Sequence, residues 1–253
     1  MTAGRSGRRR RRRTGVLLAV LVVAAVAGLL LWQDGAGPAG QSPTAGPESA
    51  SPAQGTVGPG GVPPGRLALA RMQLDHLEVR GWDRTSDFRR QEFGPAWSDD
   101  VEVEFGHNGC NTRDDILRRD LGNLVLRPGT CFVQSGTLID PYTASTIEFV
   151  RGPRTSGSIE IDHVVSLADA WYKGARAWDR QRRLDFANDP LNLLAVSPTA
   201  NFDKAYRDAS SWLPPNEAFR CDFVARQIEV KTAYHLWLSA KEKRALEAVL
   251  AHC

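Results

Sequence analysis

Four polar residues in the C-terminal half of the chain have the types and order of a hydrolytic site. Asp162 and His163 are neighbours, and Asn192 and Asn201 follow them along the chain. A neutral imidazole can take a proton from water, and carboxylate and amide oxygens suit magnesium better than zinc. An Asp-His pair alone is more often a structural hydrogen bond than a site. The two asparagines, at the spacing of two later elements, favour a site.

Three local elements would have to position these side chains. Residues 159–162 alternate between apolar and acidic, which predicts a half-buried strand that ends with the Asp-His pair. Residues 191–196 are mostly apolar and predict a second strand, interrupted around Asn192. The run 197–199, Ser-Pro-Thr, ends that strand and can cap a helix, because Ser or Thr accepts a free backbone N–H there. Asn201 would then lie in the first turns of this helix, facing the strand ends.

This order of strand, strand and helix resembles an HNH nuclease. In the ββα-metal fold of such enzymes, Asn in place of the last His is a common variant. The wider chain, over residues 107–253, is similar to secreted bacterial HNH endonuclease proteins related to the C-terminal domain of GmrSD-type restriction enzymes. Four further segments carry the resemblance: Cys110-Asn111-Thr112-Arg113, Asp140-Pro141-Tyr142, Ala168-Asp169-Ala170-Trp171 and Trp212-Leu213-Pro214-Pro215-Asn216.

The resemblance implies a role for each of the four polar residues. His163 would be the general base, and Asp162 and Asn201 would hold one divalent metal ion, Mg²⁺ or Mn²⁺. Asn192 would brace the loop behind His163. Such a cation binds a phosphate oxygen and stabilises the leaving oxygen when a phosphodiester is hydrolysed, and the imidazole takes the proton from water.

Two basic residues are candidates for contact with the substrate. Arg113 occupies a matched family position, and in the cleft it could make a bidentate contact to the scissile phosphate. A salt bridge of Arg113 to Asp114 or Asp162 is the alternative. Lys204 follows Asn201 by three positions, so it lies on nearly the same helix face. It could reach a phosphate or be an ordinary solvated lysine.

The charge of the chain is unevenly distributed. The 253 residues have a formal charge of +3, but seven arginines lie in residues 1–13. From residue 66 onward, 25 Lys and Arg face 27 Asp and Glu, a formal charge of −2. This part therefore lacks the global basic field of a tight duplex binder, and nucleic-acid affinity would have to come from a local patch and the metal.

The N-terminal quarter predicts export. A basic tail, 1–13, precedes the apolar segment 14–32, whose residues 16–32 carry no charge. This pattern is typical of a secretory signal or a single-pass membrane anchor, with the Arg-rich end in the cytoplasm. Residues 33–65 are rich in Gly, Pro, Ala and Ser and predict a disordered linker. Residues 66–253 would form the folded domain outside the cytoplasm.

Four cysteines lie beyond the export segment: Cys110, Cys131, Cys221 and Cys253. In an exported chain an even number indicates two disulfides, although four cysteines allow three pairings. We expect Cys110–Cys131 and Cys221–Cys253, because each pair falls within one substructure. A zinc site is disfavoured because no close Cys-x-x-Cys spacing occurs.

The remaining elements predict an α+β fold, in which helices surround a ββα-metal (HNH/His-Me finger) core. Short strands are expected at 124–126, 131–133 and 146–150. A helix capped by Thr112 would begin the matched region, and Trp97 belongs to an aromatic group more suited to covering the core than to stacking on bases. Further helices are expected at these positions: 66–78, 167–178, 181–187 and two beyond 219. His107 is either a second metal ligand or, the interpretation we favour, a loop residue.

These features together predict an exported, metal-dependent HNH endonuclease that hydrolyses phosphodiester bonds, with DNA as the expected substrate. The alternative is a non-catalytic cell-surface binding module on a degenerate nuclease scaffold. A toxin domain would have the same site and would need an immunity protein as partner. Metal-dependent turnover of plasmid separates an enzyme from a binding module.

Overall fold

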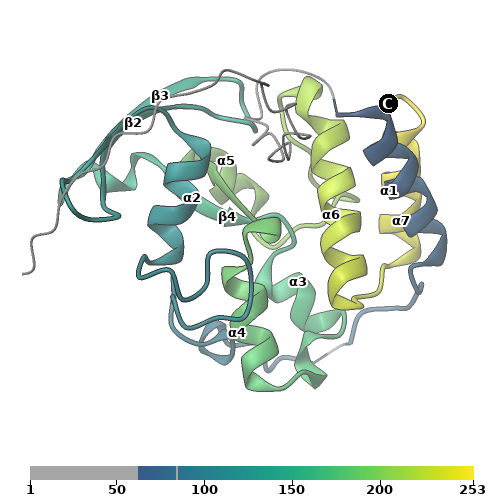
Figure 1. The fold of residues 1–253 in the computed structure, drawn as a ribbon. Helices are drawn as coiled ribbons and strands as arrows, with labels where there is room; N and C mark the ends of the chain where they lie inside the picture. Colours follow the sequence, from purple (N-terminus) through teal and green to yellow (C-terminus); the bar gives the residue numbers. More distant parts are fainter. Residues whose placement is uncertain (1–61, 84) are drawn as a thin grey trace, which may run out of the picture. The chain divides into compact units, whose positions relative to one another are not determined.

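The strand pair β4 and β5 lies between the helices in a computed structural model that describes residues 62–83 and 85–253 (Figure 1). β4 (Glu160–His163) and β5 (Leu193–Val196) are antiparallel, and Asp162 faces Leu194 in the register. All four residues of β5 are buried. The strand expected from the alternation at 159–162 and the strand expected from the apolar run at 191–196 are therefore confirmed, the second over its last four residues.

Helix α5 (Pro198–Lys204) follows β5 directly. Ser197 is its N-cap, and its side chain accepts a hydrogen bond from the backbone N–H of Ala200, as the sequence predicted. The interruption expected around Asn192 is a short 3₁₀ turn, Pro190–Asn192. The order strand, strand, helix is thus present in a mixed α+β structure.

A second sheet has the strand order β1-β2-β3. Its antiparallel strands are β1 (Gly122–Leu126), β2 (Val133–Ile139) and β3 (Thr146–Val150). The strand expected at 131–133 begins only at its last residue. Cys131 instead lies in the turn that joins β1 to β2, because the backbone N–H of Arg127 pairs with the carbonyl of Phe132 and closes the turn.

Helix α2 (Thr112–Asp120) packs beside this sheet. Its N-cap is Asn111, one residue earlier than expected. Asn111 accepts from the N–H of Asp114, whereas the Thr112 hydroxyl donates to the carbonyl of Ser98. The Thr112 side chain is therefore used in a tertiary contact and is not free to cap the helix.

The connection between β4 and β5 is helical. α3 (Leu167–Tyr172), a 3₁₀ turn at Ala175–Ala177, and α4 (Arg180–Asn188) lie between the strands. The helices expected at 167–178 and 181–187 are confirmed, with a break at Gly174, whose φ of +132° favours glycine. Another 3₁₀ turn, Arg90–Phe93, packs against α4.

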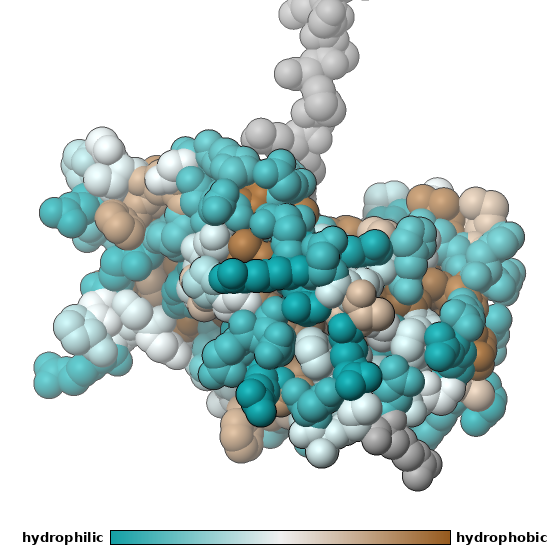
Figure 2. Space-filling view, turned by 90° about the horizontal axis from the view of Figure 1, so that it is seen from below, coloured by the Kyte–Doolittle hydropathy of each residue, from teal (hydrophilic) through white to brown (hydrophobic). Residues whose placement is uncertain are grey.

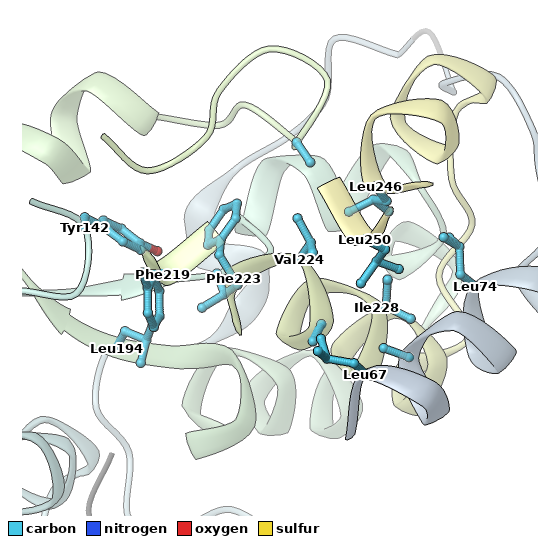
Figure 3. Close-up of a cluster of buried hydrophobic side chains, with 14 of the residues drawn as sticks. Leu67, Leu74, Tyr142, Leu194, Phe219, Phe223, Val224, Ile228, Leu246 and Leu250 are labelled. Atoms are coloured by element: carbon cyan, nitrogen blue, oxygen red, sulfur yellow. The ribbon is translucent and has the colours of Figure 1, made fainter. Parts of the chain in front are cut away.

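Three helices form one side of the domain (Figure 1). α1 (Pro64–His76) packs against α6 (Arg220–Tyr234) and α7 (Ala240–Leu250). Leu67 and Leu74 of α1 meet residues of α6 and α7 in the largest apolar cluster (Figure 3). The helix expected at 66–78 and the two beyond 219 are therefore confirmed.

A buried ionic cluster connects α3 to α6 and α7. Lys173 and Lys231 are fully buried. The ammonium group of Lys173 lies 2.5 Å from Asp169, 2.8 Å from Asp208 and 2.6 Å from Glu242. Lys231 contacts Asp169 and Glu242 at 2.8 and 2.7 Å. Burial of both lysines is tolerated because each is surrounded by carboxylates.

Two disulfides have the expected pairing. Cys110 is bonded to Cys131 with a Cα–Cα separation of 5.6 Å, and Cys221 to Cys253 with 5.8 Å. The first ties the loop before α2 to the β1–β2 turn. The second ties the last residue of the chain to α6. Both Cα–Cα separations lie in the usual range for disulfides.

The predicted basic tail 1–13, the apolar segment 14–32 and all but the end of the linker 33–65 lie outside the described residues. Within the described ranges, no helix is both long and apolar enough to span a membrane. Figure 2 shows one face of the domain on which hydrophilic residues predominate and hydrophobic ones are scattered.

Candidate functional site

A cavity of about 360 Å³ brings together side chains from β4, α2 and α5. Four of the predicted site residues line it, namely Asp162, His163, Asn201 and Arg113. The other two, Asn192 and Lys204, do not line the cavity and are fully buried behind its wall. His107, by contrast, lies in an exposed loop where its ring contacts Glu102, as expected for a loop residue.

His163 is held by a backbone carbonyl. Its Nε2 lies 2.9 Å from the carbonyl oxygen of Ala187, at the end of α4. A carbonyl only accepts, so Nε2 carries the proton and Nδ1 keeps the lone pair. Burial is the main cause that lowers the pKa of His163 to about 3, which the positive charges of Arg90 and Lys204 reinforce. The imidazole is therefore neutral near pH 7, the form that accepts a proton.

Asn192 fixes the loop that follows His163. Its Oδ1 accepts from the N–H of Val165 at 2.8 Å, and its Nδ2 donates to the carbonyl of Val165 at 3.1 Å. Its own carbonyl accepts from the N–H of Val164 at 2.8 Å. The side chain is fully buried. These contacts hold the backbone of the two residues that follow His163.

Asp162 is engaged through both carboxylate oxygens. The Tyr142 hydroxyl donates to Oδ2 at 2.6 Å, and the Lys204 ammonium lies 3.0 Å from each oxygen. The carboxylate is 5% exposed. Burial raises its pKa, and the charge of Lys204 opposes that rise. Each oxygen keeps a lone pair, since an ionised carboxylate offers about four acceptor sites.

Lys204 does not have the role expected of it. The side chain is fully buried, so it is not a solvated lysine, and it does not line the cavity where a phosphate would lie. Its Nζ donates to Asp162 and, at 2.8 Å, to the carbonyl of His163. The cause is the helix position: in α5 it lies on the side that packs against β4, where a buried carboxylate and a carbonyl need a donor.

Asn201 and Glu160 both line the cavity and are joined by a hydrogen bond. Asn201 Nδ2 donates to Glu160 Oε2 at 2.6 Å, which leaves the amide Oδ1 as its acceptor. Glu160 lines the cavity and is exposed. The sequence indicates Glu160 only as a polar position in an alternating strand. Because it lies two residues before Asp162 on the same strand face, the alternation itself could have indicated it.

Arg113 reaches the cavity from the first turn of α2. Its Nη2 donates to the carbonyls of Ser156 and Ile159, each at 2.9 Å. Neither salt bridge considered for it is formed, since Asp114 is paired with Arg151 and Asp162 with Lys204. Burial is the main cause that lowers the pKa of Arg113. The guanidinium is thus positioned by backbone oxygens and retains its other N–H donors for a ligand.

Trp97 is a site residue that the sequence did not indicate. Its ring is stacked on the imidazole of His163, with 6.0 Å between centroids and 12° between planes. It lines the cavity together with Arg90. The sequence predicts Trp97 as one of the aromatic residues that cover the core. The segment has no periodicity, and the φ of +60° at Trp97 marks an irregular backbone, so no local signal was available.

Comparison with known proteins identifies the family of the chain. The family described as "GmrSD restriction endonucleases, C-terminal domain" matches residues 111–249. The chain belongs to this family. An "Uncharacterized secreted protein" of Arthroderma benhamiae is 34% identical over 186 residues, which are 73% of this chain and 84% of that protein. No solved structure matches the chain.

The structure shows what residues of the four segments that resemble the GmrSD C-terminal family contact. Tyr142 of the Asp-Pro-Tyr segment is the hydrogen-bond donor to Asp162. Asp169 of the Ala-Asp-Ala-Trp segment belongs to the buried ionic cluster. Cys110 forms a disulfide, and Trp212 packs edge-on against Tyr142 with 5.1 Å between centroids. None of these four residues lines the cavity, and among them Tyr142 donates to a residue that does, Asp162.

The donor set at the cavity consists of the oxygen atoms that hard divalent cations take as ligands. Glu160, Asp162 and Asn201 offer oxygen atoms only, and the proton on Nε2 directs that side of His163 to Ala187. Magnesium takes oxygen ligands, binds through one or two carboxylates and keeps several waters. Within the described residues, no group of three or more His, Cys, Asp or Glu side chains could hold a metal ion. The set suits Mg²⁺ or Mn²⁺ far better than zinc.

Proposed function

We propose that this protein is an exported, metal-dependent endonuclease of the HNH type that hydrolyses phosphodiester bonds, with DNA as its substrate. The observation that carries the proposal is the neutral imidazole of His163, with its tautomer set by Ala187, beside the oxygen donors of one cavity. Membership of a restriction endonuclease family supports a nuclease-related activity.

The side chains divide the chemistry among them. His163 would take the proton of an attacking water at Nδ1, since Nε2 already donates to Ala187. Arg113 would contact a non-bridging phosphate oxygen with the N–H groups it has left. Asp162, Asn201 and Glu160 would hold the cation. When bound, a divalent cation neutralises phosphate charge and stabilises the leaving oxygen.

Lys204 and Asn192 would act by positioning. Lys204 donates to the His163 carbonyl and to Asp162. Asn192 holds the next two residues of the loop. Both would therefore fix the backbone that carries the general base, His163, and the metal ligand, Asp162. Such positioning matters because small displacements of a catalytic group lower the rate.

Export is the second part of the proposal. Two disulfides join all four cysteines, and such bonds persist in oxidising compartments. The relative from Arthroderma benhamiae carries the description "secreted". The basic and apolar start of the chain supports the same location, as a cleaved signal or as a single-pass anchor.

One observation favours the alternative, a non-catalytic binding module. The charge of Asp162 is already balanced by the Lys204 ammonium, which weakens the attraction of that carboxylate for a cation. Incubation of the purified oxidised protein with supercoiled plasmid or with RNA, in magnesium, manganese or chelator, decides between the two. We expect nicking of plasmid that needs the cation and disappears in His163→Ala; the absence of turnover with either cation would support the binding module.

A further inference from the structure

Two aromatic residues that follow cavity-lining residues in the chain are largely exposed to solvent. Phe202 is 82% exposed and Tyr206 is 60% exposed, the highest values for large hydrophobic residues in the described part of the chain. Isolated exposed apolar residues are ordinary. Two aromatic residues four positions apart in the chain, both more exposed than any other large apolar side chain described, need a reason.

Both aromatic residues adjoin residues of the cavity wall. Phe202 directly follows Asn201, and Tyr206 directly follows Ala205, and both Asn201 and Ala205 line the cavity. The carbonyl of Tyr206 accepts a hydrogen bond from the hydroxyl of Ser166 at 3.4 Å, and Ser166 also lines the cavity. Both residues therefore belong to the helix and turn that supply one part of the cavity wall, although their rings are not part of the lining.

The local backbone explains why these rings point outward. In α5 the buried positions are Ala200 and Lys204, so position 202 lies on the opposite side of the helix. Ala205 ends the helix with φ +50°, and the residue after it leaves the helical path. No packing demand on this side selects an aromatic residue, so a polar side chain would serve the fold equally well.

Because the domain is close to neutral, its binding to nucleic acid would need a contribution other than phosphate neutralisation. Residues 66–253 have a formal charge of −2, so few counterions would be released on binding to a duplex. Arg90 and Arg113 at the cavity can contact one or two phosphates. Aromatic rings can add affinity by stacking on the faces of bases, and these faces are available only where bases are unpaired.

Resting on the proposed function, we propose that Phe202 and Tyr206 form a stacking platform for unpaired bases. The substrate class is then single-stranded nucleic acid, or a locally unpaired segment of a duplex. The bases would stack on the platform while the adjoining phosphate enters the cavity. In an intact duplex the base faces are covered by their neighbours, and the platform would have nothing to stack on.

The test separates binding from cleavage. The full chain, with its disulfides intact, is titrated in chelator against a single-stranded oligonucleotide containing 2-aminopurine and against its duplex. We expect tighter binding of the single strand, with quenching of the 2-aminopurine fluorescence by stacking. Phe202→Ala and Tyr206→Ala should each weaken single-strand binding roughly five- to hundredfold, the usual effect of losing one base–aromatic stack.

Three variants act as controls. Phe202→Trp should keep the affinity, because it keeps a ring, whereas Phe202→Leu should lose it although it keeps an apolar side chain. Phe132→Ala removes an aromatic residue that is 43% exposed in the β1–β2 turn, and it should leave binding unchanged. Since Phe202 and Tyr206 are exposed, their loss should not lower the melting temperature.

Two results would overturn the platform. One is equal or tighter binding of the duplex, and the other is unchanged single-strand binding in Phe202→Ala and Tyr206→Ala, which would assign the rings to a protein partner. Plasmid nicking in magnesium, measured in parallel, reports on the proposed function alone. If the protein nicks plasmid but Phe202→Ala and Tyr206→Ala leave single-strand binding unchanged, only the platform is refuted. If binding depends on the two rings but no plasmid is nicked, only the proposed endonuclease activity is refuted.

Discussion

Replacing Lys204 by Met tests whether this lysine is part of the fold or part of the substrate site. The substitution keeps most of the side-chain volume and removes the ammonium group. It leaves the buried Asp162 carboxylate with one remaining partner, the Tyr142 hydroxyl, and it leaves the His163 carbonyl without its lysine donor. A structural lysine and a phosphate-binding lysine predict different outcomes.

The structure sets the expected magnitude. Lys204 is fully buried and Asp162 is 5% exposed, so this is a buried pair and not a surface one. Removing one partner of such a pair costs about 3–5 kcal/mol, because the other charge stays buried and uncompensated. For a domain of this size, each kcal/mol lowers the melting temperature by about 2–4 °C. We therefore expect a fall of roughly 6–20 °C.

The assay is equilibrium unfolding in guanidinium chloride with calorimetry alongside. Lys241→Met is the matched control, since Lys241 is an exposed lysine of α7, and its stability should change by less than about 0.5 kcal/mol. The double variant Asp162→Asn with Lys204→Met removes both charges. It should be less destabilised than the sum of the single variants by about 0.5–3 kcal/mol, the range of coupling between contacting groups.

The reasoning fails if Lys204→Met unfolds at the same denaturant concentration as the wild type. The same conclusion follows if it stays stable and binds nucleic acid more weakly, with a salt dependence reduced by about one phosphate contact. Those results would favour a phosphate contact for Lys204, one of the two alternatives that the sequence predicts.

Four further predictions concern the site and the export of the chain. His163→Ala should lower kcat about 10²–10⁴-fold with little change in cation affinity by calorimetry, whereas Asn201→Ala should weaken cation binding; full nicking by His163→Ala would make the Asp-His pair structural. Trp97→Ala should lower kcat by roughly two- to twelvefold, the value of one ring–ring contact, and Trp97→Phe should restore most of it; equal rates in both would show that stacking does not position the imidazole. Reduction of Cys221–Cys253, which spans 32 residues, should cost about 3–4 kcal/mol, and two or more thiols reactive before reduction would contradict the disulfides. The slope of log affinity against log salt should be shallow for the near-neutral domain, and a slope implying about eight phosphate contacts would reveal an unrecognised basic surface.

The sequence by itself determined the local elements around the site. β4, β5 and α5 follow from alternation, an apolar run and a capping serine, which are signals contained within four to nine residues. The order Asp162-His163, Asn192, Asn201 indicated an HNH nuclease, and four further segments indicated the GmrSD C-terminal family. The cysteine pairing was also anticipated, because each pair lies within one substructure.

Only the tertiary structure decided what each site residue contacts. The donor to Asp162 comes from Tyr142, 20 residues earlier, and the acceptor for His163 comes from Ala187, 24 residues later. Trp97 stacks on His163 from a segment without periodicity. No spacing rule encodes such pairs. They exist because folding buries polar groups that must then find partners wherever the chain supplies them, and this same demand turned Lys204 inward from the surface its sequence position suggested.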